Sequence, residues 1–165
     1  MAFVFGYGSL MDCGDEPIPC HLDGYRRRWN VAMDNSVDLP GYKYYVDPAT
    51  GERPPVFVTF LNVEPAAGSV VDGVAFWVSD ATLTQLDDRE RNYLRRDVTD
   101  LVREDFGDRV DAYVARPEAR ERFESAHRDG RAVISRDYYK KVLDGFATVD
   151  EPCCPVVDLR RVDLP

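Results

Sequence analysis

Hydrophobic residues fall in short, separated runs through the first two thirds of the chain, a pattern typical of β-strands. The run at 2–7 leads directly into Gly8 and Ser9, which predicts a buried first strand that closes in a tight turn. Further strands are expected at 25–33, 56–63, 70–78, 94–102 and 109–115, with residues 64–69 as the turn between the third and fourth strands. Segment 34–55 is rich in Pro, Gly, Asp and Tyr, and we expect a long irregular excursion there.

Capping residues and helical spacing predict three helices in the second half of the chain. Ser79 is a typical N-terminal cap for a helix over 79–92. Pro117 and Gly130 bracket a second, highly charged helix that should lie on the surface. A third helix is expected at 135–143. Its apolar face should consist of Tyr138, Tyr139, Val142 and Leu143.

The order of these elements predicts an α+β fold, because strands cluster first and helices are few. We expect a mixed, curled sheet or small barrel with a few helices packed outside it. The 165 residues suit one domain, expected over 1–150. The Pro- and Val-rich segment 151–165 should be an extended tail that packs on the same domain.

The charge balance narrows the choice of partners. Asp and Glu outnumber Lys and Arg by 30 to 21, which gives a formal net charge of −9. An acidic surface repels phosphate backbones and anionic lipids, so neither nucleic acid nor a membrane is an expected partner. The first residues lack a basic region and a long apolar run, so no signal peptide is predicted, and we expect a cytoplasmic, reduced protein.

The residue types of common catalytic and metal sites are sparse. Cysteines occur at Cys13, Cys20, Cys153 and Cys154, a spacing that matches neither a zinc finger nor a disulfide scaffold. Of the two histidines, His21 is expected to be structural and His127 to be solvated. The dinucleotide-like start at 6–8 lacks its third glycine, since Met11 stands there.

A glycine-containing segment, Phe5–Leu10, follows the first predicted strand. Glycines at such a point let backbone N–H groups turn toward a ligand without obstruction by a Cβ atom. The loop could bind a carboxylate or an oxyanion. An ordinary strand-ending turn explains the same residues, so the segment alone decides nothing.

A carboxylate occupies the inward stripe of the predicted helix at 79–92. Glu90 follows Leu83 by seven residues and therefore lies almost directly two turns above it. A buried glutamate has a raised pKa and can accept a proton near neutral pH. A buried ion pair with Arg95 or Arg96 accounts for the position equally well.

Taken together, these segments resemble the γ-glutamylcyclotransferase-like superfamily, also called AIG2-like. The matching segments are 5–10, 22–29, 71–78, 86–93, 112–114 and 142–145. Their order and spacing run through most of the chain, and the Tyr-Gly-Ser loop followed by the Glu90 helix is the most specific pair.

The resemblance implies a roll-like mixed barrel and an enzyme that releases 5-oxoproline from a γ-glutamyl amine or peptide. It implies Glu90 as the general acid/base and no metal or cofactor. The residues implied to bind the small-molecule substrate are Tyr7, Gly8, Ser9, Leu10, Tyr93 and Tyr113.

Two other functions are compatible with the sequence. The first is a non-catalytic module that binds a metabolite on the same scaffold. The second is an acidic interaction domain in which Glu90 is purely structural, which is weakened because a buried carboxylate is costly unless it is used or paired.

Overall fold

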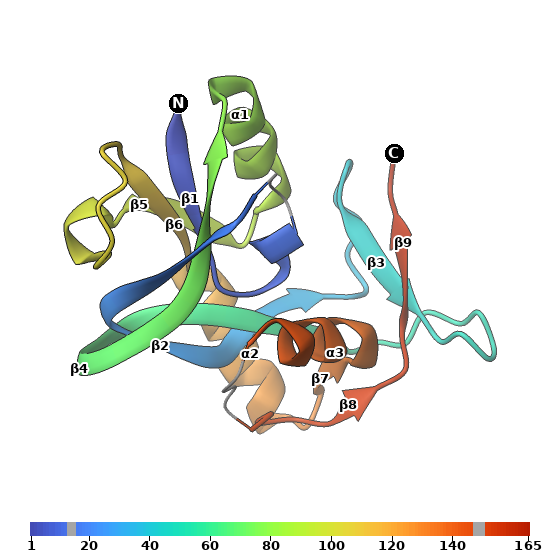
Figure 1. The fold of residues 1–165 in the computed structure, drawn as a ribbon. Helices are drawn as coiled ribbons and strands as arrows, with labels where there is room; N and C mark the ends of the chain where they lie inside the picture. The colour runs from blue at the N-terminus through green and yellow to red at the C-terminus, as the bar shows by residue number, and fades with distance from the viewer. Residues whose placement is uncertain (13–15, 147–150) are drawn as a thin grey trace.

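The computed structural model describes residues 1–12, 16–146 and 151–165. These residues form a seven-stranded mixed sheet and a separate two-stranded sheet, with three α-helices packed around them (Figure 1). The main sheet has the order β5-β6-β1-β4-β7-β8, and β2 also pairs with β4. The predicted α+β class with a curled mixed sheet is confirmed.

The strands are β1 (Ala2–Gly6), β2 (Ile18–Asp34), β3 (Lys43–Val46), β4 (Phe57–Val78), β5 (Tyr93–Asp97), β6 (Val110–Ala115), β7 (Ala132–Ser135), β8 (Val156–Val157) and β9 (Arg160–Asp163). The helices are α1 (Asp80–Arg89), α2 (Pro117–Arg128) and α3 (Arg136–Gly145), with short 3-10 turns η1 (Ser9–Asp12) and η2 (Thr99–Leu101).

The strand β1 lies near the middle of the main sheet and carries the predicted glycine loop. It pairs antiparallel with β4 and parallel with β6. Its consecutive residues Val4 and Phe5 point to opposite faces of the sheet, and both are fully buried. Both faces are therefore covered, which fixes the position at which the chain leaves the strand.

The strands β2 and β4 form a long antiparallel ribbon that bends across the molecule (Figure 1). The prediction of two strands joined by a turn at 64–69 is wrong, because β4 runs through this segment. The pairing passes from Asp23 with Val70 to Tyr25 with Pro65, so four residues of β4 stand opposite Gly24 alone. The Pro and Gly of 64–69, which suggested a turn, lie where the pairing is irregular, and the strand continues in one direction through them.

The helix α1 begins as predicted but ends earlier. The Ser79 hydroxyl accepts a hydrogen bond from the Thr82 N–H at 3.2 Å, which confirms the N-cap. The helix ends at Arg89 and Glu90 is its C-cap, so the predicted end at residue 92 is wrong. The backbone N–H of Glu90 still donates to the Leu86 carbonyl oxygen at 2.8 Å, so Glu90 stays on the same side of the helix as the buried residue Leu86.

The other two helices differ in how well they match the prediction. In α2, Pro117 opens the helix as expected, and the narrow buried seam consists of Ala119, Phe123 and Ala126. The third helix was predicted to begin at residue 135. Residue 135 instead ends strand β7, which spans 132–135, and α3 starts at Arg136. In α3, Val142 is buried but Leu143 is 44% exposed, so Leu143 does not belong to the apolar face.

Two segments expected to lack regular structure form a small sheet. The predicted irregular excursion at 34–55 contains β3, and the tail at 151–165 contains β8 and β9. The strand β9 pairs antiparallel with β3, set off from the main sheet (Figure 1). We call the β3–β9 pair the strap. The predicted boundary at residue 150 and Cys13 lie outside the described residues.

The remaining strand prediction needs a small correction, and the prediction for His127 is confirmed. The strand expected at 94–102 is divided into β5 and η2, and residue 98 starts the 3-10 turn. His127 is exposed, as predicted, and it also stacks on Phe123 and lies 2.9 Å from the Cys153 carbonyl oxygen. No helix in the described ranges is long and apolar enough to cross a membrane.

Candidate active site

The loop after β1 is fixed from both sides by buried hydrogen bonds. The Tyr7 hydroxyl donates to the Tyr113 carbonyl oxygen at 2.6 Å. Arg27, only 7% exposed, donates from Nε to the Tyr7 carbonyl oxygen at 3.2 Å. Arg27 also binds Asp72 and lies 3.7 Å above the centre of the Phe146 ring. The loop is thus held in one position by the strands beneath it.

Gly8 lies close to Tyr138. A Cβ atom at this position would lie 3.1 Å from the Tyr138 hydroxyl oxygen, so a larger residue would have to displace that hydroxyl group by a few tenths of an ångström. Within the described part of the chain, the N–H groups of Gly8 and Ser9 have no hydrogen-bond acceptor. They remain available to a ligand in the space beside the loop.

Glu90 lies beside this loop with its side chain mostly buried. The side chain is 13% exposed, and Oε1 lies 3.4 Å from Arg89 Nε. Burial raises the pKa of Glu90, and the nearby charges of Arg89, Lys43 and Arg161 oppose the shift. The carboxyl group is thus suited to take up and release a proton.

The ion pair considered from the sequence takes a different form. Arg95 does not pair with Glu90, because its guanidinium binds Asp87 at 3.0 Å and Asp111 at 3.1 Å. The partner of Glu90 is Arg89, which adjoins it in sequence.

A small cavity of about 20 Å³ is lined by every residue that the sequence predicted for catalysis or substrate binding. It is lined by Glu90 and by the six predicted binding residues, Tyr7, Gly8, Ser9, Leu10, Tyr93 and Tyr113, together with Leu61 and Tyr138. Residues more than a hundred positions apart in the chain therefore meet at one point.

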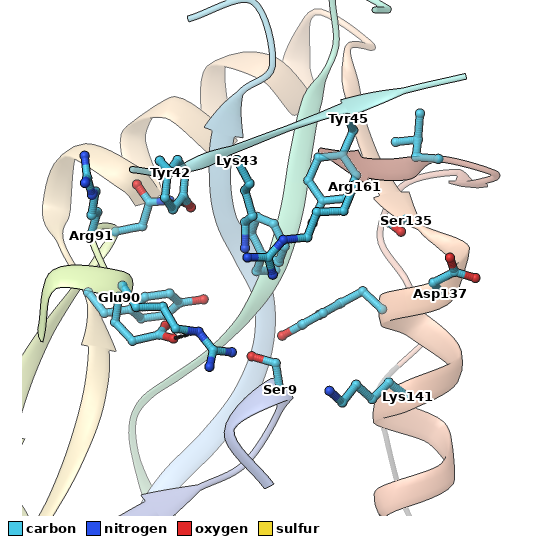
Figure 2. A pocket seen from close by; sticks show the side chains of 16 residues that line it. Ser9, Tyr42, Lys43, Tyr45, Glu90, Arg91, Ser135, Asp137, Lys141 and Arg161 are labelled. Carbon is cyan, nitrogen blue, oxygen red and sulfur yellow. Dashed lines mark hydrogen bonds and ion pairs between the residues drawn. The ribbon is translucent and has the colours of Figure 1, made fainter. Parts of the chain in front are cut away.

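A larger cavity of about 220 Å³ adjoins the small one. Ser9, Glu90, Tyr93 and Tyr138 line both. Figure 2 shows the larger cavity between Glu90 and Ser9 on one side and α3, with Asp137 and Lys141, on the other. The two cavities are therefore adjacent, and we call the small one the recess.

The tyrosines of the recess are neutral hydroxyl groups with defined partners. Tyr93 donates to the Leu61 carbonyl oxygen at 2.6 Å, and Tyr113 donates to Asp87 Oδ1 at 2.8 Å. The Tyr138 oxygen accepts from the Leu61 N–H at 3.3 Å. Burial raises the pKa of all three well above the ordinary value, so they stay protonated and shape the recess without adding charge.

Several lining residues were not identified from the sequence. They are chiefly the cations of the larger cavity, Lys43, Arg89, Arg91, Lys141 and Arg161. Lys43 and Arg161 stand on the strap, whose strands could not be paired from sequence alone. The available signal was weak: residues 42–46 read Tyr-Lys-Tyr-Tyr-Val and residues 160–163 read Arg-Arg-Val-Asp, and neither run alternates clearly between polar and apolar positions.

No group of three or more His, Cys, Asp or Glu side chains arranged to hold a metal ion occurs among the described residues. The available chemistry consists of one proton-transferring carboxyl group, unpaired backbone N–H groups and a set of cations. Such a site can bind an anionic molecule, stabilise an oxyanion and move one proton.

Comparison with known proteins supports the same family as the residue pattern. The family model described as gamma-glutamyl cyclotransferase, AIG2-like matches residues 4–140. No match is found among curated proteins.

Solved structures match the chain at low identity and with TM-scores below 0.5. A yeast gamma-glutamyl cyclotransferase specific to glutathione is 17% identical, with a TM-score of 0.45 over 69% of this chain and 68% of that chain. An Arabidopsis thaliana protein is 17% identical, with a TM-score of 0.44 over 90% and 95% of the two chains. YkqA from Bacillus subtilis is 14% identical, with a TM-score of 0.49 over 92% of this chain and 56% of that chain. Because the family model spans more than four fifths of the sequence, the chain belongs to the gamma-glutamyl cyclotransferase, AIG2-like family.

Proposed function

We propose that this protein is a γ-glutamyl cyclotransferase that releases 5-oxoproline from a γ-glutamyl amine or peptide. One observation carries the proposal. The Glu90 carboxyl group and the loop Tyr7–Leu10 line the same recess, and Glu90 and Ser9 also line the adjoining cavity of about 220 Å³, which has room for a small substrate.

The nucleophile in this reaction belongs to the substrate. The α-amine of the γ-glutamyl group attacks its own side-chain carbonyl carbon, a five-membered lactam forms, and the amide C–N bond to the leaving amine breaks. Holding amine and carbonyl in attack geometry supplies an effective molarity on the order of 10⁵ M or more in favourable cases. The protein therefore needs to fold the substrate rather than supply a nucleophile.

Glu90 is proposed to move protons from the attacking nitrogen to the leaving one. Its carboxylate accepts a proton from the α-ammonium group, which frees the amine to attack, and returns it to the leaving nitrogen as the C–N bond breaks. The attacking nitrogen loses its second proton as the lactam forms, and the carboxylate regenerated in the preceding step accepts it. The raised pKa of Glu90 suits these steps, since a group with a pKa nearer neutrality gives up a proton as readily as it accepts one.

The loop is proposed to stabilise the charge that develops on the carbonyl oxygen. The N–H groups of Gly8 and Ser9 have no acceptor within the described residues, so they can donate to an oxyanion without breaking other bonds. Arg27 and Tyr113 hold the loop rigid through Tyr7, so the donors need little rearrangement during the reaction.

The direct test is a substrate panel with 5-oxoproline as the measured product. γ-Glutamyl dipeptides, glutathione and γ-glutamyl amines are incubated with wild-type protein, with Glu90→Gln and with Asp88→Asn, which removes an exposed carboxylate of the same helix. We expect product from wild type and Asp88→Asn and none above background from Glu90→Gln. A panel in which compounds bind wild type but none releases 5-oxoproline would instead support a metabolite-binding module.

A further inference from the structure

The larger cavity is rich in positive charge although the protein as a whole is acidic. Five cationic side chains line it, against the two carboxylates Glu90 and Asp137, while the whole chain carries a formal net charge of −9. Such a local reversal of charge creates a binding site for an anion.

Two of these cations come from the strap and project into the cavity. Figure 2 shows Lys43 reaching down from β3 and Arg161 reaching across from β9, on the side of the cavity away from Ser9. Their strands pair in the register that places Tyr45 opposite Arg161. The strap therefore presents two like charges to the same space.

Lys43 has aromatic neighbours and, among the described residues, no carboxylate within ion-pair distance. Its Nζ lies 4.5 Å from the centre of the Phe60 ring and 5.3 Å from that of Tyr42. Its strand pairing places Asp163 opposite it, but its ammonium group makes no hydrogen bond or ion pair in the described part of the chain. Burial and the charge of Arg161 lower the pKa of Lys43 to about 8, against the opposing charges of Glu90 and Asp163. An ammonium group beside a like charge, without a carboxylate in contact, is stabilised by an anionic ligand.

Arg161 is only partly engaged. Its Nε donates to Asp163 Oδ1 at 2.7 Å, and the side chain is 48% exposed. A guanidinium group held at one edge can still present its other N–H groups to a carboxylate.

We propose that the strap forms a subsite for an acidic leaving group, so that the preferred substrates are γ-glutamyl conjugates of acidic amino acids, such as γ-glutamyl-glutamate. This inference rests on the proposed function and extends it from the γ-glutamyl half of the substrate to the amine that is expelled. With the γ-carbonyl group of the substrate at the recess beside Glu90, the rest of the γ-glutamyl group and the leaving amino acid extend into the larger cavity. The side-chain carboxylate of the leaving amino acid then meets Lys43 and Arg161. The products are 5-oxoproline and the free acidic amino acid.

The test compares substrates that differ only in charge. Values of kcat/KM are measured for γ-glutamyl-glutamate against γ-glutamyl-glutamine, and for γ-glutamyl-aspartate against γ-glutamyl-asparagine. Because a hydrogen bond to a charged group contributes about 1.5–3 kcal/mol, we expect wild type to prefer the acidic member of each pair by roughly 10-fold or more.

Two variants locate the preference. Lys43→Met and Arg161→Gln should each bring the acid-to-amide ratio toward one, mainly by lowering kcat/KM for the acidic substrate. Arg160→Gln, which removes the preceding arginine of β9 outside the cavity lining, should leave the ratio unchanged. A wild-type ratio near one overturns the proposal. So does an equal loss on acidic and neutral substrates in both strap variants, which would mean that the strap binds the γ-glutamyl carboxylate instead.

A binding measurement separates this inference from the proposed reaction. Calorimetric titration of Glu90→Gln with γ-glutamyl-glutamate and γ-glutamyl-glutamine gives the affinity difference without turnover. Tighter binding of the acidic compound, with no 5-oxoproline from wild type, would support the subsite and reject the cyclotransferase reaction. Equal binding of the two compounds, with 5-oxoproline released from both, would reject the subsite and leave the reaction standing.

Discussion

Glu90 is held mostly out of water, with Arg89 in ion-pair contact and Lys43 and Arg161 nearby, and its burial has a cost in stability. Its pKa lies above the ordinary value of 4.5 mainly because burial disfavours the charged form. The penalty is absent below the ordinary pKa, where the group is protonated in both folded and unfolded states. It grows as the pH rises through the folded-state pKa.

Glu90→Gln is therefore expected to melt at a higher temperature than wild type at pH 8. The difference should shrink as the pH is lowered toward 4, because wild type then carries a neutral carboxyl group as well. Thermal denaturation at both pH values checks this, with Asp88→Asn as the exposed control. A Glu90→Gln protein no more stable than wild type at pH 8 would mean that Arg89 fully compensates the buried charge.

Arg27 connects the scaffold to the candidate site, and its loss should affect both. Arg27→Met leaves the buried Tyr7 carbonyl oxygen without its donor, which should lower the free energy of unfolding by about 2 kcal/mol. Arg26→Met, which removes an exposed neighbour that pairs with Glu64, should change it by less than about 0.5 kcal/mol. Urea denaturation measures both, and equal effects of the two substitutions would contradict the role given to Arg27.

Lys43 should make the preference for acidic leaving groups depend on pH. Its pKa of about 8 means that it is charged below pH 8 and neutral well above it, so the acid-to-amide ratio of kcat/KM should fall between pH 7 and pH 9.5. The groups that face Lys43 are Arg161 and Asp163 of β9, Glu90 and Arg89 at the end of α1, and the rings of Tyr42 and Phe60.

The ratio should not fall to one, because Arg161 stays charged throughout this range. Lys43→Arg, which cannot lose its charge, should give a ratio independent of pH. A wild-type ratio that stays constant from pH 7 to pH 9.5 would exclude Lys43 as the titrating group.

At the scale of elements, the close pairing of β1 with β4 determines where the glycine loop begins. A Cβ atom on Gly73 would lie 2.5 Å from Phe5 Cζ and 2.6 Å from the Gly6 carbonyl oxygen, and the backbone oxygen cannot move aside. Close strand approach at this point therefore depends on glycine.

Gly73→Ala should consequently lower stability by about 1–3 kcal/mol and also reduce activity, because β1 would shift just before Tyr7. Val70→Ala, at a 43% exposed position of the same strand, is the control and should have little effect on either. Urea denaturation and the 5-oxoproline assay together test this. A Gly73→Ala protein of wild-type stability would contradict the close packing of β1 on β4.

Elements with strong local signals were predictable, and those held by distant pairing were not. The Ser79 cap, the Pro117 start and the apolar run of β1 each depend on neighbouring residues, so the sequence alone located them. The strand β7 has four residues and pairs in parallel with β4 and β8, so its identity depends on partners far along the chain. The strap likewise joins residues 43–46 to residues 160–163.

At the scale of the whole molecule, the candidate site is assembled from separate parts of the chain. The loop after β1, the end of α1 and strand β6 supply the recess, and these are the segments on which the resemblance to a known family was recognised. The larger cavity takes further charged residues from the strap and α3, where the sequence suggested only an irregular segment, a tail and an apolar helix face. Sequence reasoning therefore identified the residues proposed for the reaction but not those proposed to choose the leaving group.

The central claim is that Glu90 transfers the proton for lactam formation in the recess next to Tyr7–Leu10. The most direct measurement is the rate of 5-oxoproline formation by wild type and Glu90→Gln, each saturated with the best γ-glutamyl substrate, with the affinity of each measured separately. If Glu90 transfers the proton, the rate in Glu90→Gln is lower by roughly 10²–10⁴-fold with substrate still bound. A rate within a few-fold of wild type would contradict the claim.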